Sequence, residues 1–266
     1  MLEENQNFPN AWQAFLLIIA LFIAEILAGL LLHAAAASLA IDVAAQSALA
    51  SVLGSGLVFV WLLHFKKLSY AQLFHPSSAS IRATLFLLLP PILLVVPALI
   101  LGLSVSLDWV ESIFPLSDQE KALFESMQPN SAAAIVATCL LAPVLEEMMF
   151  RGIIMRSFLH QYGRAQAIWG SALLFGFAHL NMYQFIVGVV LGATLAWLYE
   201  RTRSLWPCIT LHCAYNSGLA VLSLIEPESV NSDPPWLSAP LVWLAVVLMA
   251  WAGIHALRRL LLPKPV

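Results

Sequence analysis

The stretch that decides the fold is SAAAIVATCLLAPVLEEMMFRGIIMRSFL, residues 131–159. It is long enough to cross a bilayer, because a membrane helix needs about 20 mostly apolar residues. Yet it contains two adjacent glutamates, Glu146 and Glu147, with Arg151 four residues after the second. A charged side chain at the centre of a membrane helix costs roughly 2.5–3.5 kcal/mol on insertion scales, and such residues are usually functional. The stretch therefore predicts a membrane span with a chemical site inside it.

The composition of the whole chain agrees with a membrane protein. Of its 266 residues, 61% are hydrophobic and only 10% are charged, whereas about 25% charged residues is usual in a soluble domain. We expect an all-α, polytopic membrane helix bundle of about eight transmembrane helices, forming a single integral-membrane domain over residues 1–266. The predicted spans are Trp12–His33, Ala44–Phe65, Ala83–Leu107, Ser131–Leu159, Ala165–Leu180, Tyr183–Glu200, Leu205–Ile225 and Trp236–Leu257. The polar connection Asp108–Asn130 is expected to hold a short surface helix.

The placement of lysine and arginine predicts the orientation of these spans. Cytoplasmic loops carry an excess of these two residue types. With eight spans, nearly all basic residues fall on one side, which we expect to be the cytoplasm: Lys66, Lys67, Arg82, Arg156, Arg164, Arg201, Arg203, Arg258, Arg259 and Lys264. Both termini are then cytoplasmic. The chain is predicted to be an integral protein of a bacterial inner (plasma) membrane.

Few strongly polar groups remain inside the predicted spans. They are Glu25 and His33 in the first span, Glu146, Glu147 and Arg151 in the fourth, His179 in the fifth, and His212 and Asn216 in the seventh. At about 1.5 Å per residue, Glu146 and His179 lie roughly 20 Å, and His212 roughly 13 Å, from the side of the membrane that carries the basic residues. Polar groups away from water need one another as partners. We therefore expect an active-site cavity between the fourth, fifth and seventh helices.

Helical spacing predicts which of these side chains share a face. Residues four apart are neighbours on a helix surface. Three pairs are related in this way: Glu147 with Arg151, Phe175 with His179, and His212 with Asn216. The first pair can form an ion pair. Glu146 is rotated by about 100° from Glu147, so it can point towards the histidines instead.

Three motifs resemble a known family. EEMMFR at 146–151 matches EExxxR, FGFAH at 175–179 matches FxxxH, and HCAYN at 212–216 matches HxxxN. In this order, on hydrophobic helices, they resemble the CPBP (CAAX protease and bacteriocin-processing, or ABI) family of intramembrane endopeptidases, which includes the type II CAAX prenyl proteases. The resemblance covers a protease core of about residues 131–225.

The resemblance implies a role for each motif residue. Glu146 would be the general base that activates water, and His179 would help to hold that water. His212 and Asn216 would stabilise the oxyanion of the tetrahedral intermediate. Glu147 and Arg151 would be the supporting pair that fixes the helix, and Phe175, one turn from His179, is expected to support the site as well. The function so implied is an intramembrane endopeptidase that hydrolyses a peptide bond in or near the bilayer.

Elementary chemistry is compatible with two versions of this protease. A buried glutamate can act as a general base, and amide or imidazole donors can stabilise an oxyanion. This version needs no cofactor, and it is the one we prefer. Glu146, His179 and His212 could instead bind zinc, since two histidines, a carboxylate and a water match catalytic zinc sites. No HExxH motif is present, so a glutamate-type and a metalloprotease mechanism both stay open.

Two further classes of function remain as alternatives. Intramembrane Glu and His residues also serve proton-coupled transporters. A non-enzymatic immunity or scaffold protein could use the same fold without cleavage. The expected partners are membrane lipid and a peptide or protein substrate, lipidated or membrane-embedded, and not nucleic acid. Glu25 and His33 lie eight residues apart on roughly one face, where they could pair or face a hydrated cavity.

Overall fold

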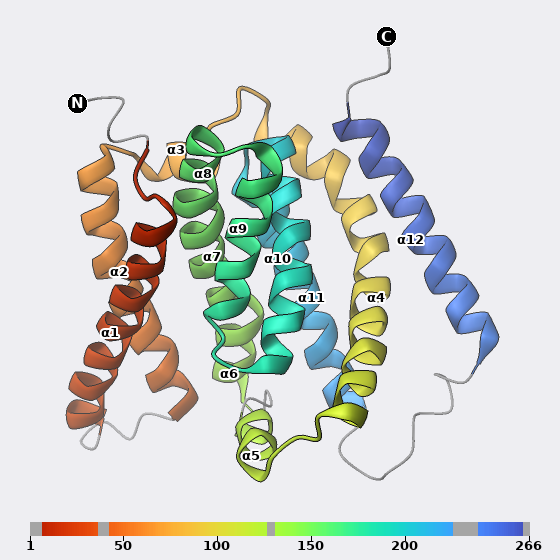
Figure 1. The fold of residues 1–266 in the computed structure, drawn as a ribbon, viewed down its shortest axis with the longest axis horizontal. Coiled ribbons are helices and arrows are strands. Elements are labelled where there is room, and N and C mark those ends of the chain that lie inside the picture. Colours follow the sequence, from red (N-terminus) through yellow and green to blue (C-terminus); the bar gives the residue numbers. More distant parts are fainter. Residues whose placement is uncertain (1–6, 37–42, 127–130, 226–238, 263–266) are drawn as a thin grey trace.

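The computed structural model describes residues 7–36, 43–126, 131–225 and 239–262. Every regular element in this part of the chain is a helix, as the sequence predicts (Figure 1). The elements are α1 (Ala11–Ala36), α2 (Val43–Lys66), α3 (Tyr70–Phe74), α4 (Ile81–Ile113), α5 (Asp118–Ser126), α6 (Ala132–Val136), η1 (Ala137–Leu141), α7 (Ala142–Glu147), η2 (Met148–Met155), α8 (Arg156–Gln161), α9 (Arg164–Phe177), α10 (Met182–Thr202), α11 (Leu205–Ile225) and α12 (Pro240–Leu261).

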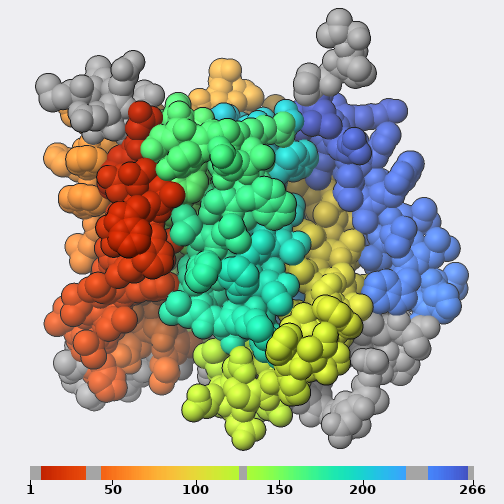
Figure 2. Space-filling model, viewed as in Figure 1, coloured from red at the N-terminus to blue at the C-terminus, as the bar shows by residue number. Residues whose placement is uncertain are grey.

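Seven helices in the described residues are long and apolar enough to cross a membrane. One of them is the continuous helix from α6 to α8, Ala132–Gln161. Large apolar side chains are exposed along the outer helices, such as Leu31 on α1, Phe86 on α4 and Leu241 on α12. Figure 2 shows one outer face of the bundle, over which α1, α9, α10 and α12 are spread. An apolar surface of this kind fits lipid rather than water, and the chain is an integral membrane protein.

The fifth predicted span, Ala165–Leu180, is shorter in the structure than the sequence suggested. Its helix, α9, has 14 residues and ends at Phe177. At 1.5 Å per residue it is roughly 21 Å long, which is less than the hydrocarbon core of a bilayer. The helix stops because Leu180 has a left-handed backbone (φ 54°) and Asn181 caps α10, accepting hydrogen bonds from the Tyr183 and Gln184 backbone N–H groups. His179 therefore lies in the turn after α9, not on the helix.

The central membrane helix is interrupted by two π-helical segments. η1 precedes α7 and η2 follows it, so Glu146 and Glu147 lie between two wider turns. Pro143, at the start of α7, has no backbone N–H, and its ring crowds the carbonyl group four residues earlier. The wider turn of η1 gives this proline room. Single π-turns inside α-helices often occur at functional sites.

The long helices pack in pairs, and of these α2, α9, α10 and α11 contact the central helix. α1 lies along α2 and α9 along α10, while α4 contacts both α11 and α12. α4 bends along its length (Figure 1), as its three internal prolines Pro90, Pro91 and Pro97 predict. The predicted surface helix within Asp108–Asn130 is α5. The start of the last predicted span, at Trp236, lies outside the described residues.

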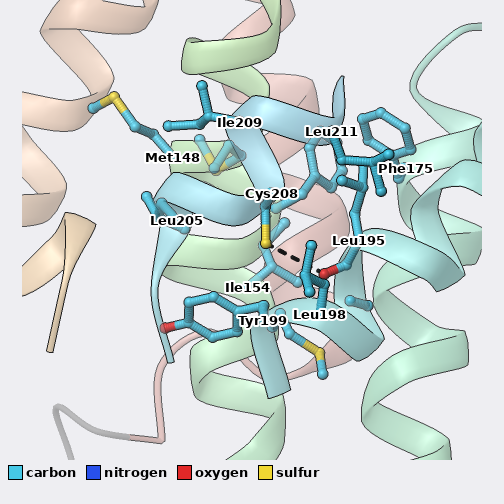
Figure 3. Close-up of a cluster of buried hydrophobic side chains, with 14 of the residues drawn as sticks. Met148, Ile154, Phe175, Leu195, Leu198, Tyr199, Leu205, Cys208, Ile209 and Leu211 are labelled. Carbon is cyan, nitrogen blue, oxygen red and sulfur yellow. Dashed lines mark hydrogen bonds between the residues drawn. The ribbon is translucent and has the colours of Figure 1, made fainter. Parts of the chain in front are cut away.

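A buried apolar cluster joins η2, α10 and α11 (Figure 3). It includes Ile154, Leu195, Tyr199 and Cys208, all fully buried or nearly so. The Cys208 thiol donates to the backbone carbonyl of Leu195 at 3.4 Å, which links α11 to α10. This core fixes the position of α11 relative to the central helix.

The beginning of α1 and the end of α12 lie at the same end of the bundle (Figure 1). α2 and the central helix also finish at this end, with Lys66 and with Arg156 on α8. We refer to it as the basic end. The structure thus places these basic residues at one end of the bundle, as the distribution of lysine and arginine in the sequence predicted. Which compartment the basic end faces stays a prediction.

Candidate active site

A buried ion pair occupies the centre of the site. Arg151 on η2 donates from Nη1 to Glu147 Oε1 at 3.0 Å, and neither side chain has any exposed surface. The i,i+4 spacing predicted this pair. The second terminal nitrogen, Nη2, donates to the carbonyl of Gly192 on α10, also at 3.0 Å. The guanidinium also lies over the ring of Phe175, 4.5 Å from its centroid. Arg151 thus ties three helices together around Glu147.

His212 on α11 connects the two glutamates. Its Nδ1 lies 3.0 Å from Glu147 Oε1, and its Nε2 lies 3.7 Å from Glu146 Oε2. Because Glu147 is paired with Arg151, its carboxylate is an acceptor, so Nδ1–H of His212 is the donor in this contact. The other ring nitrogen then faces Glu146. The hydrogen bond from His212 to Glu147 was not anticipated from the sequence, which assigned Glu147 only to the ion pair.

His179 is held in a similar way. Its Nδ1 lies 2.9 Å from the backbone carbonyl of Phe175, and a carbonyl can only accept, so Nδ1–H is the donor. In the neutral ring, Nε2 then has a free lone pair. His179 and His212 both pack edge-on against the Phe175 ring, with their ring centroids 5.2 and 5.7 Å from its own. Phe175 therefore lies in contact with both imidazoles.

Asn216 is one helical turn beyond His212 on α11. Its amide donates to the backbone carbonyl of Thr138 in η1 at 2.9 Å. Carbonyl groups in a π-helical segment are not all used by the helix, so a side-chain donor can reach one. This contact joins α11 to the central helix a second time. Asn216 is only partly buried.

Close packing of α9 against α10 makes this arrangement possible. A Cβ on Gly176 would lie 2.8 Å from the Phe185 carbonyl oxygen, and a Cβ on Gly188 would lie 2.8 Å from the Gly176 Cα. A Cβ on Gly192 would come within 3.1 Å of the Phe175 ring. Glycine at these positions lets α10 approach closely enough for the Gly192 carbonyl to accept from Arg151.

Glu146, His179 and His212 are also the predicted zinc ligands. Among the described residues, no group of three or more His, Cys, Asp or Glu side chains is arranged to hold a metal ion. Nδ1 of each histidine is already used by Glu147 or by the Phe175 carbonyl. Nε2 of His212 is 3.7 Å from the Glu146 carboxylate, with the two in direct apposition. These contacts leave Nε2 of each histidine open, and metal-ligating histidines commonly donate their other ring N–H in this way, so zinc binding stays an alternative, and we derive no step through a metal.

Comparisons with known proteins single out the same part of the chain. Residues 128–218 match the family described as type II CAAX prenyl endopeptidase Rce1-like. This segment contains all three motifs. The resemblance to the CPBP family is thereby confirmed.

A protein of Bacillus subtilis (strain 168), named "Putative membrane peptidase YdiL", is 29% identical over 111 residues. That alignment covers 42% of this chain and 45% of the relative. No solved structure gives a significant match.

The Rce1-like segment includes α7, η2, α9, α10 and most of α11, the elements that carry the site described above. α1, α2, α4 and α12 lie outside it. Glu25, on α1, nevertheless has a defined place, because it accepts a hydrogen bond from Ser55 of α2 at 2.7 Å. His33 lies further along α1 and is exposed. The structure assigns no contact between Glu25 and His33.

Proposed function

We propose that this protein is an intramembrane endopeptidase, related in mechanism to the CAAX prenyl proteases, in which Glu146 activates water. The family match and the peptidase name of the Bacillus relative support a membrane peptidase. The single observation that carries the mechanism is the contrast between the two glutamates. Glu147 is sealed and bonded to Arg151 and His212, whereas the Glu146 side chain is 32% exposed and lies 3.7 Å from His212 Nε2.

Each polar group then has one task in peptide hydrolysis. Glu146 accepts a proton from water as the water oxygen attacks the scissile carbonyl carbon. Nε2 of His179 accepts a hydrogen bond from the same water and orients it. Glu147 stabilises His212 as an imidazolium, whose Nε2–H donates to the oxyanion, together with the Asn216 amide. When the C–N bond breaks, Glu146 returns its proton to the leaving amine. Once Glu146 has lost this proton, the negative charges of the two glutamates are balanced by the positive charges of Arg151 and the His212 imidazolium.

The substrate is proposed to be a peptide or protein that reaches the site from the membrane, in lipidated or membrane-embedded form. The protein would act in a bacterial inner membrane with its basic end and both termini in the cytoplasm. The proposed mechanism requires no metal ion. A metal analysis of the purified protein distinguishes it from the zinc alternative.

The test is cleavage by protein reconstituted in lipid vesicles. The probe is a fluorogenic peptide with a farnesylated C-terminal Cys-a-a-X sequence, compared with the same peptide lacking the farnesyl group. Glu146→Gln should lower kcat by at least about 100-fold, since it removes the general base. His179→Ala and His212→Ala should also abolish cleavage. Glu111→Gln, at the exposed end of α4, is the matched control and should cleave normally. Unchanged activity in all three site variants would refute the proposal.

A further inference from the structure

His179 is placed by a turn and not by a helix. α9 ends at Phe177, and the backbone N–H groups of His179 and Leu180 donate to the carbonyls of Gly176 and Phe177 at 3.1 and 3.2 Å. Leu180 has a φ of 54°, which is uncommon for residues other than glycine. Backbone of this kind persists only where the surrounding structure holds it. Contacts beyond α9 are therefore needed to fix the turn.

Asn181, the next residue, makes such contacts with both ends of its amide. Its Oδ1 accepts from the backbone N–H groups of Tyr183 and Gln184, at 3.0 and 3.2 Å, and so caps α10. Its Nδ2 donates to Oε1 of Glu120 on α5 at 3.4 Å. Aspartate would cap a helix equally well, but a carboxylate has no N–H to donate to Glu120. The amide therefore links the turn to α5 as well as to α10.

The Glu120 carboxylate is oriented for this contact by the start of α5. Its other oxygen, Oε2, accepts from the Ser117 backbone N–H at 2.9 Å and from the Ser117 hydroxyl at 2.6 Å. The Glu120 N–H in turn donates to the Ser117 hydroxyl at 3.3 Å, so the two residues form a capping box. Because Ser117 fixes one carboxylate oxygen, the other stays directed at Asn181.

Two further contacts join the same parts of the chain. α5 lies at the end of the bundle opposite the basic end (Figure 1). The Tyr183 hydroxyl, in the first turn of α10, donates to the carbonyl of Phe114, directly after α4. The Tyr183 ring is buried and packs edge-on against Phe124 of α5, with ring centroids 6.1 Å apart. Residues 114–124 thus brace the first turn of α10 and, through Asn181, the turn that carries His179.

We propose that α5 is a strut that sets the position of His179, with Glu120 as the positioning residue and Asn181 as the link. The proposal rests on the function proposed above, in which Nε2 of His179 orients the attacking water. Glu120 does not touch the substrate, and it acts through the backbone of the turn. α5 precedes the Rce1-like segment, 128–218, so the strut adds a part that the family match does not contain.

Exchanging the donor and the acceptor tests the link. Asn181→Asp still caps α10 but places a second carboxylate against Glu120. The kcat for the farnesylated peptide should fall by about tenfold or more with KM within about twofold, because the turn shifts and the water is misplaced while the substrate is not. Adding Glu120→Gln supplies an amide that donates to the introduced carboxylate, so the double variant should regain most of the lost kcat. Normal kcat in Asn181→Asp, or no recovery in the double variant, would overturn the proposal.

Glu125, which is exposed on the same helix, provides the matched control. Glu125→Gln removes the same charge from α5, should cleave normally, and should not rescue Asn181→Asp. Rescue by Glu125→Gln would show that the net charge of α5 is responsible and would contradict the strut. Asn181→Asp should unfold at or above the temperature of the unmodified protein, since a carboxylate at a helix N-terminus is stabilising. Glu120→Ala removes the acceptor without adding charge and should also lower kcat, and equal kcat to the unmodified protein would count against the proposal.

A measurement that needs no cleavage separates the strut from the peptidase. The imidazole nitrogens of His179 are followed by NMR in protein with isotope-labelled histidine, and His179→Ala assigns their signals. Asn181→Asp should shift these signals, and the double variant with Glu120→Gln should return them. Unchanged signals in Asn181→Asp would refute the strut alone, whatever the activity. A reversible shift in a protein without any Glu146-dependent cleavage would support the strut and refute the peptidase alone.

Discussion

Replacing Arg151 by methionine should destabilise the protein far more than removing an exposed arginine. Arg151 is fully buried, donates to Glu147 and to the Gly192 carbonyl, and lies over Phe175. Methionine fills much of the same volume but leaves the Glu147 carboxylate buried without its counter-charge. Breaking a buried ion pair by removing one partner costs about 3–5 kcal/mol. The lost charged hydrogen bond to Gly192 belongs to the same penalty and is not added to it.

The assay is reversible unfolding of the reconstituted protein, followed by tryptophan fluorescence against denaturant. Arg164→Met is the control, because Arg164 pairs with Glu200 at 3.1 Å but its side chain is 47% exposed. An exposed pair of this kind contributes about 1 kcal/mol or less. The free energy of unfolding should therefore fall by several times more in Arg151→Met than in Arg164→Met.

A double variant shows whether the charge is the cause. Glu147→Gln combined with Arg151→Met removes both charges, so much of the lost stability should return. Activity should not return, because His212 has lost the carboxylate that holds its Nδ1–H. If Arg151→Met is no less stable than Arg164→Met, or if the double variant is less stable than either single variant, the reasoning about a buried charge is wrong.

Three further predictions follow from the same structure. Gly176→Ala should lower the free energy of unfolding by about 1–3 kcal/mol through overpacking against α10, whereas Gly102→Ala, with nothing within 4 Å, should not. At the start of α5, the hydrogen bonds from Ser117 lower the pKa of Glu120. This contact stabilises the fold at pH values above the ordinary pKa of glutamate, and the contribution is lost as the pH falls through the lowered pKa. Ser117→Ala should therefore raise the Glu120 pKa, as measured by NMR with labelled glutamate. Chelators should leave the rate of peptide cleavage unchanged, and inhibition that zinc reverses would favour the metal alternative.

Much of the site could be predicted because polar groups are rare in this chain. Within an apolar helix, the positions of Glu146, Glu147 and Arg151 are informative on their own, and i,i+4 spacing correctly paired the last two. Depth along each helix also placed His212 near the glutamates. The number of spans was harder, because the end of α9 depends on a left-handed residue, Leu180, and hydropathy contains no signal for backbone angles.

What the sequence could not provide were contacts to backbone atoms. The carbonyl groups of Phe175, Gly192 and Thr138 accept from His179, Arg151 and Asn216, and every residue has a carbonyl, so residue types do not reveal which ones are used. The π-helical segments around α7 were missed for a related reason. Pro143 was the available signal, since a proline inside a membrane helix requires a local change in hydrogen bonding.

The two adjacent glutamates show how one residue type can serve two purposes. Glu147 is fully buried, with Arg151 and His212 bonded to the same oxygen, so Glu147→Gln should lower both the free energy of unfolding and kcat. Glu146 is 32% exposed and lies 3.7 Å from His212 Nε2, so Glu146→Gln should leave the free energy of unfolding within about 0.5 kcal/mol while abolishing cleavage. Both quantities can be measured on the same vesicles. If Glu146→Gln destabilises the protein as much as Glu147→Gln does, Glu146 is a structural residue and the general base must be sought elsewhere.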